Sequence, residues 1–281
     1  MRFTKAHGLG NDFILIPEAE APARREEWVR MLCDRHRGIG GDGVVLHAPA
    51  SDGIRMALVN ADGLPVEISG NGLRCLAALA VREGWAPAKH TVHTVVGPRP
   101  VEVASSGTGT YRIATDLGVP GLGSADVPMA LDPPREPVTA QPIEIHGRTV
   151  EVTATSMGNP HCAIFCDDVA DDALIATLGP ALENHPLFPE RTNVEFVTVR
   201  SPDEIRVRFW ERGVGPTEAS GTGSASAVVA SILTGRTARE VRAVCDGGVL
   251  DVAWPEGGAL RQVGEACLVF DGDWPASATP D

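Results

Sequence analysis

Two stretches of the chain decide its organisation: Asn60–Gly72 (NADGLPVEISGNG) and Glu211–Gly223 (ERGVGPTEASGTG). They align without a gap at an offset of 151 residues, and both contain the pattern Pro-x-Glu-x-Ser-Gly-x-Gly. Each runs into a segment rich in small residues, Leu73–Glu83 in the first copy and Ser224–Leu233 in the second. A repeated loop followed by a helix-like segment indicates a duplicated domain.

A second pair of matching stretches lies upstream of this repeat. Gly10-Asn11-Asp12-Phe13 resembles Gly158-Asn159-Pro160-His161, and each leads into an apolar segment. At about 100–200 residues per domain, a chain of 281 residues accommodates two domains. The stretch 118–137 is rich in Gly, Pro and Asp, so we expect the linker there.

Apolar and small-residue patterns predict a mixture of strands and helices. Predicted helices cover 24–37, 73–83 and 224–233, and predicted strands cover 13–16, 44–47, 54–59, 91–96, 111–115, 143–145, 149–155, 162–165, 194–199 and 205–210. The sequence Gly38-Ile39-Gly40-Gly41-Asp42-Gly43 satisfies the dinucleotide pattern GxGxxG. That pattern needs a strand before it and a helix after it, whereas here the order is reversed. We therefore interpret this stretch as a tight helix-to-strand turn. At the other end of the chain, we expect a polar, loose tail after Asp271.

Composition excludes several classes of protein. The chain has 24 basic and 37 acidic residues, and a formal net charge of −13 argues against nucleic acid or an anionic membrane as the main partner. No apolar run is long enough to span a bilayer, and the start Met1-Arg2-Phe3-Thr4-Lys5 lacks the apolar core of a secretory signal. Lys5 and Lys89 are the only lysines, which disfavours pyridoxal phosphate as a cofactor.

The six cysteines form no CxxC pair, so neither a zinc ribbon nor a thioredoxin-type motif is indicated. We expect buried, reduced thiols in a cytoplasmic protein. Among the eight histidines, His161 alone draws attention, because it lies close to Asn159 in a repeat-related loop.

The Ser-Gly-x-Gly turns have a definite physical use. Glycines let a ligand approach the backbone, and the unpaired N–H groups at a helix start, together with the helix dipole, bind a carboxylate or phosphate. The alternative is a plain capped helix, with Ser69 or Ser220 as the N-cap. Two such turns facing across a cleft would place one reactive side chain on each side of a small molecule.

Eight motifs, in order and at matching spacing from about residue 3 to residue 270, resemble the diaminopimelate epimerase family. They are Gly10–Phe13, Asp34–Gly40, Asn60–Gly63, Gly70–Cys75, Gly158–His161, Thr192–Phe196, Glu211–Gly213 and Gly221–Gly223. The resemblance implies an α+β fold of two pseudo-symmetric domains, each a mainly antiparallel sheet wrapped around a central helix. We expect residues 1–118 and 265–281 in the first domain and 119–264 in the second.

The same resemblance implies a cytoplasmic homodimer without cofactor or metal. It implies interconversion of LL- and meso-diaminopimelate in lysine and peptidoglycan-precursor synthesis. The family uses two cysteines, one per domain, to remove and return the α-proton. Here Ser69 and Ser220 stand at those positions, and a serine hydroxyl is a far weaker acid than a thiol. Glu67 and Glu218, two positions away, either assist these serines or are solvated or capping residues, and His161 is a further candidate for assistance.

The rest of the family's substrate-binding residues are present by resemblance. The reacting α-carboxylate would bind the amides of Gly70, Asn71, Gly221 and Thr222. The distal amino-acid end would bind Asn11, Asn60, Asn159, Asn193, Glu211 and Arg212. Arg212 has the geometry for a bidentate contact with a carboxylate, although a surface ion pair is the alternative.

Three interpretations remain open at this point. The chain is an isomerase of this family that works with a serine pair or other bases; or it is an ordinary epimerase inactivated by engineered Cys-to-Ser changes; or it binds an amino acid without epimerising it. A different amino-acid substrate is also open. The shared Pro-x-Glu-x-Ser-Gly pattern around both serines favours natural divergence.

Overall fold

The structure is a computed structural model that describes residues 1–168 and 171–275. The chain divides into two compact units, Met1–Asp116 with Val263–Asp281 (unit 1) and Leu117–Gln262 (unit 2). The last strand, β17 (Leu260–Asp273), runs from unit 2 back into unit 1. Each unit combines strands with helices, so the expected α+β class is confirmed. Among the described residues, none of the helices has the length and apolar character needed to cross a membrane.

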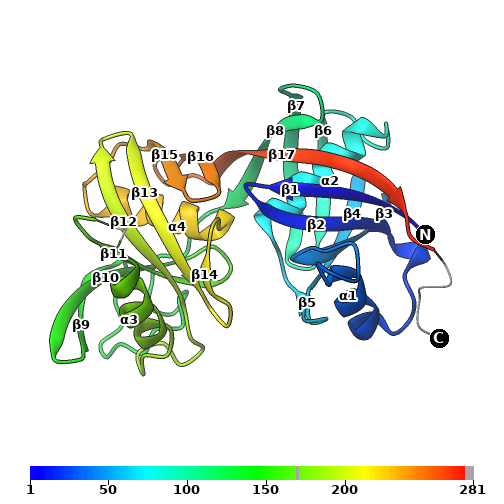
Figure 1. The fold of residues 1–281 in the computed structure, drawn as a ribbon. Coiled ribbons are helices and arrows are strands. Elements are labelled where there is room, and N and C mark those ends of the chain that lie inside the picture. Colours follow the sequence, from blue (N-terminus) through cyan, green and yellow to red (C-terminus); the bar gives the residue numbers. More distant parts are fainter. Residues whose placement is uncertain (169–170, 276–281) are drawn as a thin grey trace. The chain divides into compact units, whose positions relative to one another are not determined.

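Unit 1 is a closed ring of strands around one helix (Figure 1). Its elements are β1 (Arg2–Gly8), β2 (Asn11–Pro17), η1 (Glu18–Glu20), α1 (Arg25–Cys33), β3 (Gly43–Ala50), β4 (Gly53–Asn60), β5 (Pro65–Val66), α2 (Gly70–Arg82), β6 (Lys89–Thr94), β7 (Gly97–Ser105) and β8 (Thr110–Gly118), with β17. Strands pair in the order β17–β1–β2–β3–β4–β6–β7–β8, and β8 pairs with β17 again. Because the ring closes, α2 lies inside it and is buried.

The two sides of one strand explain how this ring is filled. On β2, Phe13 and Leu15 belong to the apolar cluster that contains α2, whereas Ile14 and Ile16 belong to the cluster that contains α1. Alternate residues of a strand point to opposite faces, so a continuous apolar run fits a strand covered on both sides. Helix α1 therefore packs outside the ring and α2 inside it.

Unit 2 repeats the pairing order of unit 1. Its elements are β9 (Val138–Ile145), β10 (Arg148–Ser156), β11 (Pro160–Phe165), α3 (Asp172–Glu183), β12 (Asn193–Ser201), β13 (Glu204–Glu211), β14 (Gly215–Thr217), α4 (Gly221–Leu233), β15 (Glu240–Cys245) and β16 (Gly248–Ala253). Strands β10–β11–β12–β13–β15–β16 pair as β1–β2–β3–β4–β6–β7 do, and the second and fourth pairs are parallel in both units. The duplication indicated by the repeated loop is therefore present in the strand pairing as well.

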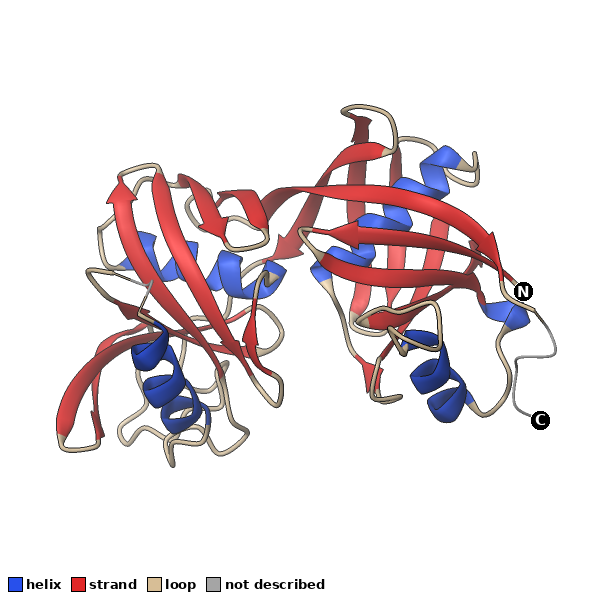
Figure 2. Cartoon of the chain, in the orientation of Figure 1, coloured by secondary structure: helices blue, strands red, loops and turns tan. Residues whose placement is uncertain are grey.

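Helices α2 and α4 occupy equivalent places in the two units, and Figure 2 shows each flanked by strands of its own unit. Residues Asn71–Ala80 of α2 are all buried, and in α4 burial extends through Ser231. A helix surrounded by packing needs small side chains on every face, which explains the Ala- and Ser-rich sequences. Gly84, at φ +71°, and Gly235, at φ +69°, follow the two helix ends, as the sequence indicated.

One prediction on the chain's organisation is wrong, and two others differ from the structure in their bounds. The predicted linker, 118–137, packs within unit 2, where Val127 and Met129 are buried. The helix predicted over 24–37 is present but ends at Cys33, because the Asp34 carboxylate accepts hydrogen bonds from the N–H groups of His36 and Arg37 and turns the chain. The strand β17 continues to Asp273, two residues beyond the start of the predicted loose tail, and most of that tail, residues 276–281, lies outside the described residues.

The turn after α1 is the helix-to-strand connection that the sequence predicted for the GxGxxG stretch. Gly38 donates a backbone hydrogen bond to Asp34, and Ile39 and Gly40 both donate to Leu32. A side chain at Gly38 would meet the Met31 carbonyl oxygen at 2.2 Å, so the turn requires glycine there. This stretch therefore terminates α1 and leads into β3.

Candidate functional site

Ser69 and Ser220 hold the same position at the start of a buried helix. Ser69 is the N-cap of α2, and its Oγ accepts a hydrogen bond from the Gly72 N–H at 3.1 Å. Ser220 is the N-cap of α4, and its Oγ accepts from the Gly223 N–H at 3.2 Å. Both serines have extended backbones, with φ/ψ of −128°/122° and −134°/123°. The two turns are therefore equivalent in geometry as well as in sequence.

The capping pattern leaves backbone donors at both helix starts. Each serine hydroxyl satisfies the third N–H of its helix, whereas the first two, at Gly70 and Asn71 and at Gly221 and Thr222, have no partner within the helix. These four amides are the ones that the family resemblance assigns to the reacting carboxylate. A helix N-terminus favours an anion there because its N–H dipoles point outward.

The last glycine of the second turn is required by packing. A side chain at Gly223 would come within 3.0 Å of the Ser220 Oγ and within 3.0 Å of Phe209. Glycine therefore lets the capping hydroxyl sit against the helix. At the equivalent Gly72 the closest neighbours would be side chains at 3.3–3.5 Å, beginning with the flexible end of Met56.

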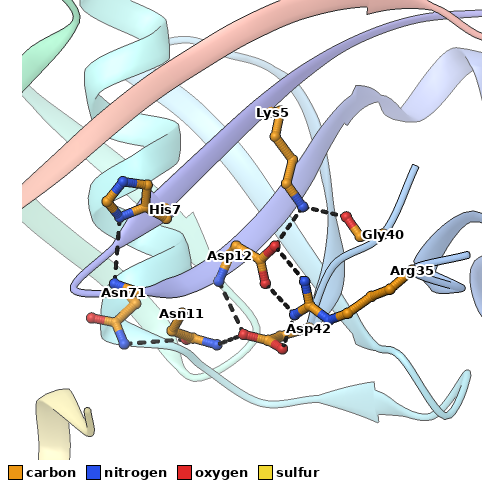
Figure 3. Close-up of polar contacts among 9 residues, drawn as sticks. Lys5, His7, Asn11, Asp12, Arg35, Gly40, Asp42 and Asn71 are labelled. Carbon is orange, nitrogen blue, oxygen red and sulfur yellow. Dashed lines mark hydrogen bonds and ion pairs between the residues drawn. The ribbon is translucent and has the colours of Figure 1, made fainter. Parts of the chain in front are cut away.

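In unit 1 the structure brings Asn11 and Asn71 together beside the α2 terminus (Figure 3). Asn71 Nδ2 donates to Asn11 Oδ1 at 3.1 Å, and Asn11 Nδ2 donates to Asp42 Oδ2 at 2.7 Å. Asn60 ends β4 opposite Gly43, and its backbone forms the turn towards β5 through hydrogen bonds with Leu64 and Gly63. These three asparagines come from three different elements of one unit.

In unit 2 a half-buried carboxyl group lies near the Ser220 hydroxyl. It belongs to Glu211, at the end of β13. Burial raises the pKa of the Glu211 carboxyl, against the opposing effects of Ser220 and of the nearby His161. A carboxyl with a raised pKa near a serine can accept that serine's proton more readily than a solvated one.

His161 lies nearby in a buried polar group on β11. Its Nδ1 is 2.7 Å from Glu195 Oε1, its Nε2 is 3.0 Å from Asn159 Oδ1, and neither His161 nor Glu195 is more than 1% exposed. Burial raises the pKa of Glu195, although the charge and hydrogen bond of His161 oppose the rise. The carboxyl thereby fixes the imidazole ring, and the ring in turn holds the Asn159 carboxamide.

Asn193 and Arg212 meet through the backbone of the turn after β13. The Arg212 N–H donates to Asn193 Oδ1 at 3.0 Å, and Asn193 Nδ2 donates to the Pro160 carbonyl at 2.9 Å. The Arg212 guanidinium donates to the Glu190 carbonyl at 3.1 Å. This turn is also held by the buried carboxylate of Glu183, which accepts from the Gly213 N–H at 2.8 Å.

The two glutamates proposed to assist the serines are exposed. Glu67 and Glu218 lie on the surface, and in the described part of the chain neither forms a side-chain hydrogen bond or ion pair with its serine. The carboxyl group that lies near Ser220 is that of Glu211, which sequence reasoning placed in substrate binding. Three further residues were missed in any role: Glu195, Glu183 and Asp42. The only available signal was a charged residue within an apolar strand, as in Asn193-Val194-Glu195-Phe196.

The cysteine thiols that the structure buries do not take the place of the two serines. All six cysteines are unpaired, and Cys33, Cys75, Cys162 and Cys245 are buried. Burial raises the pKa of Cys33 and of Cys75 to about 12, and it raises the pKa of Cys162 and of Cys245 as well. These four thiols are suited to core packing rather than to proton transfer. Over residues 1–168 and 171–275, no group of three His, Cys, Asp or Glu side chains is arranged to hold a metal ion.

Comparison with known proteins identifies relatives over nearly the whole chain. The family model described as diaminopimelate epimerase matches residues 3–120 and 153–269. A diaminopimelate epimerase from Desulforudis audaxviator is 46% identical over 280 residues, covering 98% of this chain and 99% of the relative. One from Heliobacterium modesticaldum is 43% identical over 283 residues, covering 98% of this chain and all of the relative.

Solved structures share the fold at low sequence identity. A hydroxyproline epimerase from Agrobacterium vitis matches with a TM-score of 0.68 at 13% identity, covering 97% of this chain and 91% of that one. A probable proline racemase from Agrobacterium radiobacter matches with a TM-score of 0.67 at 13% identity, covering 98% and 93%. The architecture of two strand-rich units around central helices is therefore one that other racemases and epimerases adopt.

Proposed function

Because the chain belongs to the diaminopimelate epimerase family, we propose that it is an isomerase that interconverts LL- and meso-2,6-diaminopimelate by two-base transfer of the α-proton. In this reaction one base removes the proton from one face of the α-carbon, and an acid on the opposite face returns one. We infer that it works in lysine and peptidoglycan-precursor synthesis, as a cytoplasmic homodimer and without pyridoxal phosphate.

The observation that carries this proposal is the pair of equivalent helix starts, each with a serine hydroxyl beside free backbone N–H groups. The α-carboxylate binds the amides of Gly70, Asn71, Gly221 and Thr222. These donors also stabilise the negative charge that develops on the carboxylate when the α-proton leaves. Ser69 and Ser220 supply the two proton-transfer groups, one from each unit.

The proximity of Glu211 to Ser220 supports proton transfer without a thiol. When the α-proton leaves towards Ser220, the Ser220 Oγ accepts it as its own proton passes to the Glu211 carboxylate. Ser69 gives its proton to the opposite face of the carbanion. Both groups then return to their starting states by exchanging protons with water, and the roles reverse for the opposite direction.

The distal end of the substrate binds a second set of polar residues. We propose that Asn11, Asn60, Asn159 and Asn193 bind it, together with the Arg212 guanidinium as the bidentate partner of the distal carboxylate. His161 assists by holding Asn159, to which its Nε2 is hydrogen-bonded. This role needs no proton transfer by the imidazole itself.

Hydrogen–deuterium exchange at the α-carbon tests the proposal. The protein is incubated with LL- or meso-diaminopimelate in D2O, and deuterium incorporation is followed by NMR. We expect incorporation that is lost in Ser69→Ala and in Ser220→Ala, and that becomes faster in the Ser69→Cys/Ser220→Cys double variant. The matched control is Asp171→Ala, which removes the N-cap of α3 and loses about 1 kcal/mol of stability without touching these turns.

The outcomes separate the remaining alternatives. Exchange that persists in both alanine variants would contradict the serine pair. Tight binding of diaminopimelate without exchange would identify a binding protein or an inactivated epimerase. Exchange of another amino acid, but not of diaminopimelate, would identify an isomerase with a different substrate.

A further inference from the structure

A chain of hydrogen bonds in unit 1 joins two charged residues through two side-chain amides. It runs from the buried Arg74 guanidinium to Asn71, from Asn71 to Asn11, and from Asn11 to the carboxylate of Asp42. Figure 3 shows its last three members side by side next to the α2 terminus. Asn11 and Asn71 are two of the residues proposed to bind substrate, whereas no role has so far been given to Arg74 or Asp42.

The Arg74 end of the chain determines how both amides are oriented. A guanidinium can only donate hydrogen bonds, so the Asn71 side chain must present its Oδ1 to Arg74 Nη2. The Asn71 Nδ2 then faces Asn11 at 3.1 Å, and Asn11 must in turn present its Oδ1. The Asn11 Nδ2 is thereby left on the side of Asp42.

The Asp42 end requires the same orientation independently. A carboxylate can only accept, and its Oδ2 receives hydrogen bonds from Asn11 Nδ2 at 2.7 Å and from the Asp12 N–H at 3.0 Å. Its Oδ1 receives the Arg35 guanidinium at 2.8 Å. An Asn11 amide turned by 180° would set oxygen against oxygen at Asp42 and nitrogen against nitrogen at Asn71.

We propose that Asp42 and Arg74 are positioning residues that fix Asn11 as a hydrogen-bond donor towards the ligand, so that the ligand group at Asn11 is an acceptor such as a carboxylate oxygen and not an ammonium. Asp42 Oδ2 accepts one N–H of Asn11 Nδ2, and in this proposal the second N–H is the one offered to the ligand. This inference rests on the proposed function, because it concerns the substrate end held by Asn11.

Two Asn11 variants test whether the ligand group at Asn11 accepts or donates a hydrogen bond. Asn11→Ala removes the donor, whereas Asn11→Asp replaces it by an acceptor with a negative charge. With meso-diaminopimelate as the titrated ligand, we expect affinity to fall in the order wild type, Asn11→Ala, Asn11→Asp, with about tenfold or more between the first and the last. If Asn11→Asp bound more tightly than Asn11→Ala, the ligand group would be an ammonium and the proposal would be overturned.

A comparison of Asp42→Leu with Arg35→Leu tests the positioning role of Asp42. Asp42→Leu removes the acceptor for Asn11, and we expect the Kd and KM to rise about tenfold while kcat changes less. Arg35→Leu removes the ion pairs of Arg35 with Asp12 and Asp42 but leaves the contact between Asn11 and Asp42, so it should lower affinity less. Asp42→Asn keeps an oxygen for Asn11 and should restore most of the affinity. Equal losses of affinity in the two leucine variants would indicate a merely structural network and overturn the proposal.

A readout without substrate separates this proposal from the proposed function. The side-chain NH2 signals of Asn11, identified by their loss in Asn11→Ala, should shift in Asp42→Leu and stay near their wild-type positions in Arg35→Leu. This result supports the fixed amide even if diaminopimelate is not turned over. Unchanged signals in Asp42→Leu would contradict it even if exchange with diaminopimelate is found.

Discussion

The buried pair of His161 and Glu195 gives the sharpest test of how unit 2 is held together. The Nδ1 and Oε1 atoms are 2.7 Å apart, and both side chains are almost fully enclosed. Replacing Glu195 by leucine keeps an apolar side chain of similar volume but removes the acceptor for the imidazole. Replacing it by glutamine keeps an oxygen for His161, removes the charge and puts an NH2 group in place of Oε2.

The two substitutions should therefore differ in magnitude. Removing one partner of a buried pair typically costs about 3–5 kcal/mol, so we expect this loss in the free energy of unfolding for Glu195→Leu. A hydrogen bond to a charged group contributes about 1 kcal/mol more than one between neutral groups. Glu195→Gln should therefore lose only about 1–2 kcal/mol, because His161 keeps a neutral acceptor.

Urea unfolding at neutral pH measures these losses, provided that the m-values of the variants agree. Glu256→Gln, at an exposed position, is the control and should change stability by less than about 0.5 kcal/mol. Equal losses in Glu195→Leu and Glu195→Gln would contradict this prediction, because charge rather than the missing acceptor would then dominate the loss of stability. A loss below about 1 kcal/mol in Glu195→Leu would refute it as well.

Three further predictions follow from the same structure. Burial raises the pKa of Glu211, so the ionisation of its carboxyl lowers the stability of the fold as the pH rises through that pKa. Glu211→Gln should therefore raise the urea midpoint of unfolding at neutral pH, while it lowers the rate of α-proton exchange. Burial lowers the pKa of His47 from 6.5 to about 4, so the stability that depends on its neutral form is complete above pH 6.5 and is lost as the pH falls towards 4. His47→Phe should reduce the fall in the free energy of unfolding between pH 6.5 and pH 4 by up to about 3 kcal/mol. Gly223→Ala should displace the Ser220 hydroxyl and reduce the rate of α-proton exchange by about tenfold or more. Gly72→Ala should reduce that rate less, because the new methyl group has more room. A smaller effect at Gly223 than at Gly72 would contradict the packing argument.

Elements with a strong local pattern could be predicted from the sequence. The run Phe13–Ile16 is a strand buried on both sides, and α2 and α4 begin directly after the serines of the repeated turns. N-capping and hydrophobic periodicity depend on residues close together in the chain, so they are visible without knowledge of the fold. The repeat at 151 residues indicated the duplication for the same reason.

Other elements depend on contacts that the sequence does not display. Helix α3 contains Gly179 and Pro180, which argue against a helix locally. In the structure Gly179 lies so close to the Trp210 ring that a side chain there would meet it at 2.6 Å. The segment 118–137 looks like a linker from its composition, yet it is held by burial of Val127 and Met129 in unit 2. Tertiary packing overrides local preference in both cases.

The candidate site likewise has one part that could be predicted from the sequence and one part that could not. The positions of the two serines, and the start of a helix at each, could be predicted from the sequence, because a turn and its helix are continuous in the chain. The groups that surround the serines depend on the fold. Asp42 meets Asn11 across 31 positions and Glu195 meets His161 across 34. Strand pairing creates these contacts, and the polarity of each amide and the protonation of each carboxyl follow from partners that only the fold brings within hydrogen-bonding distance.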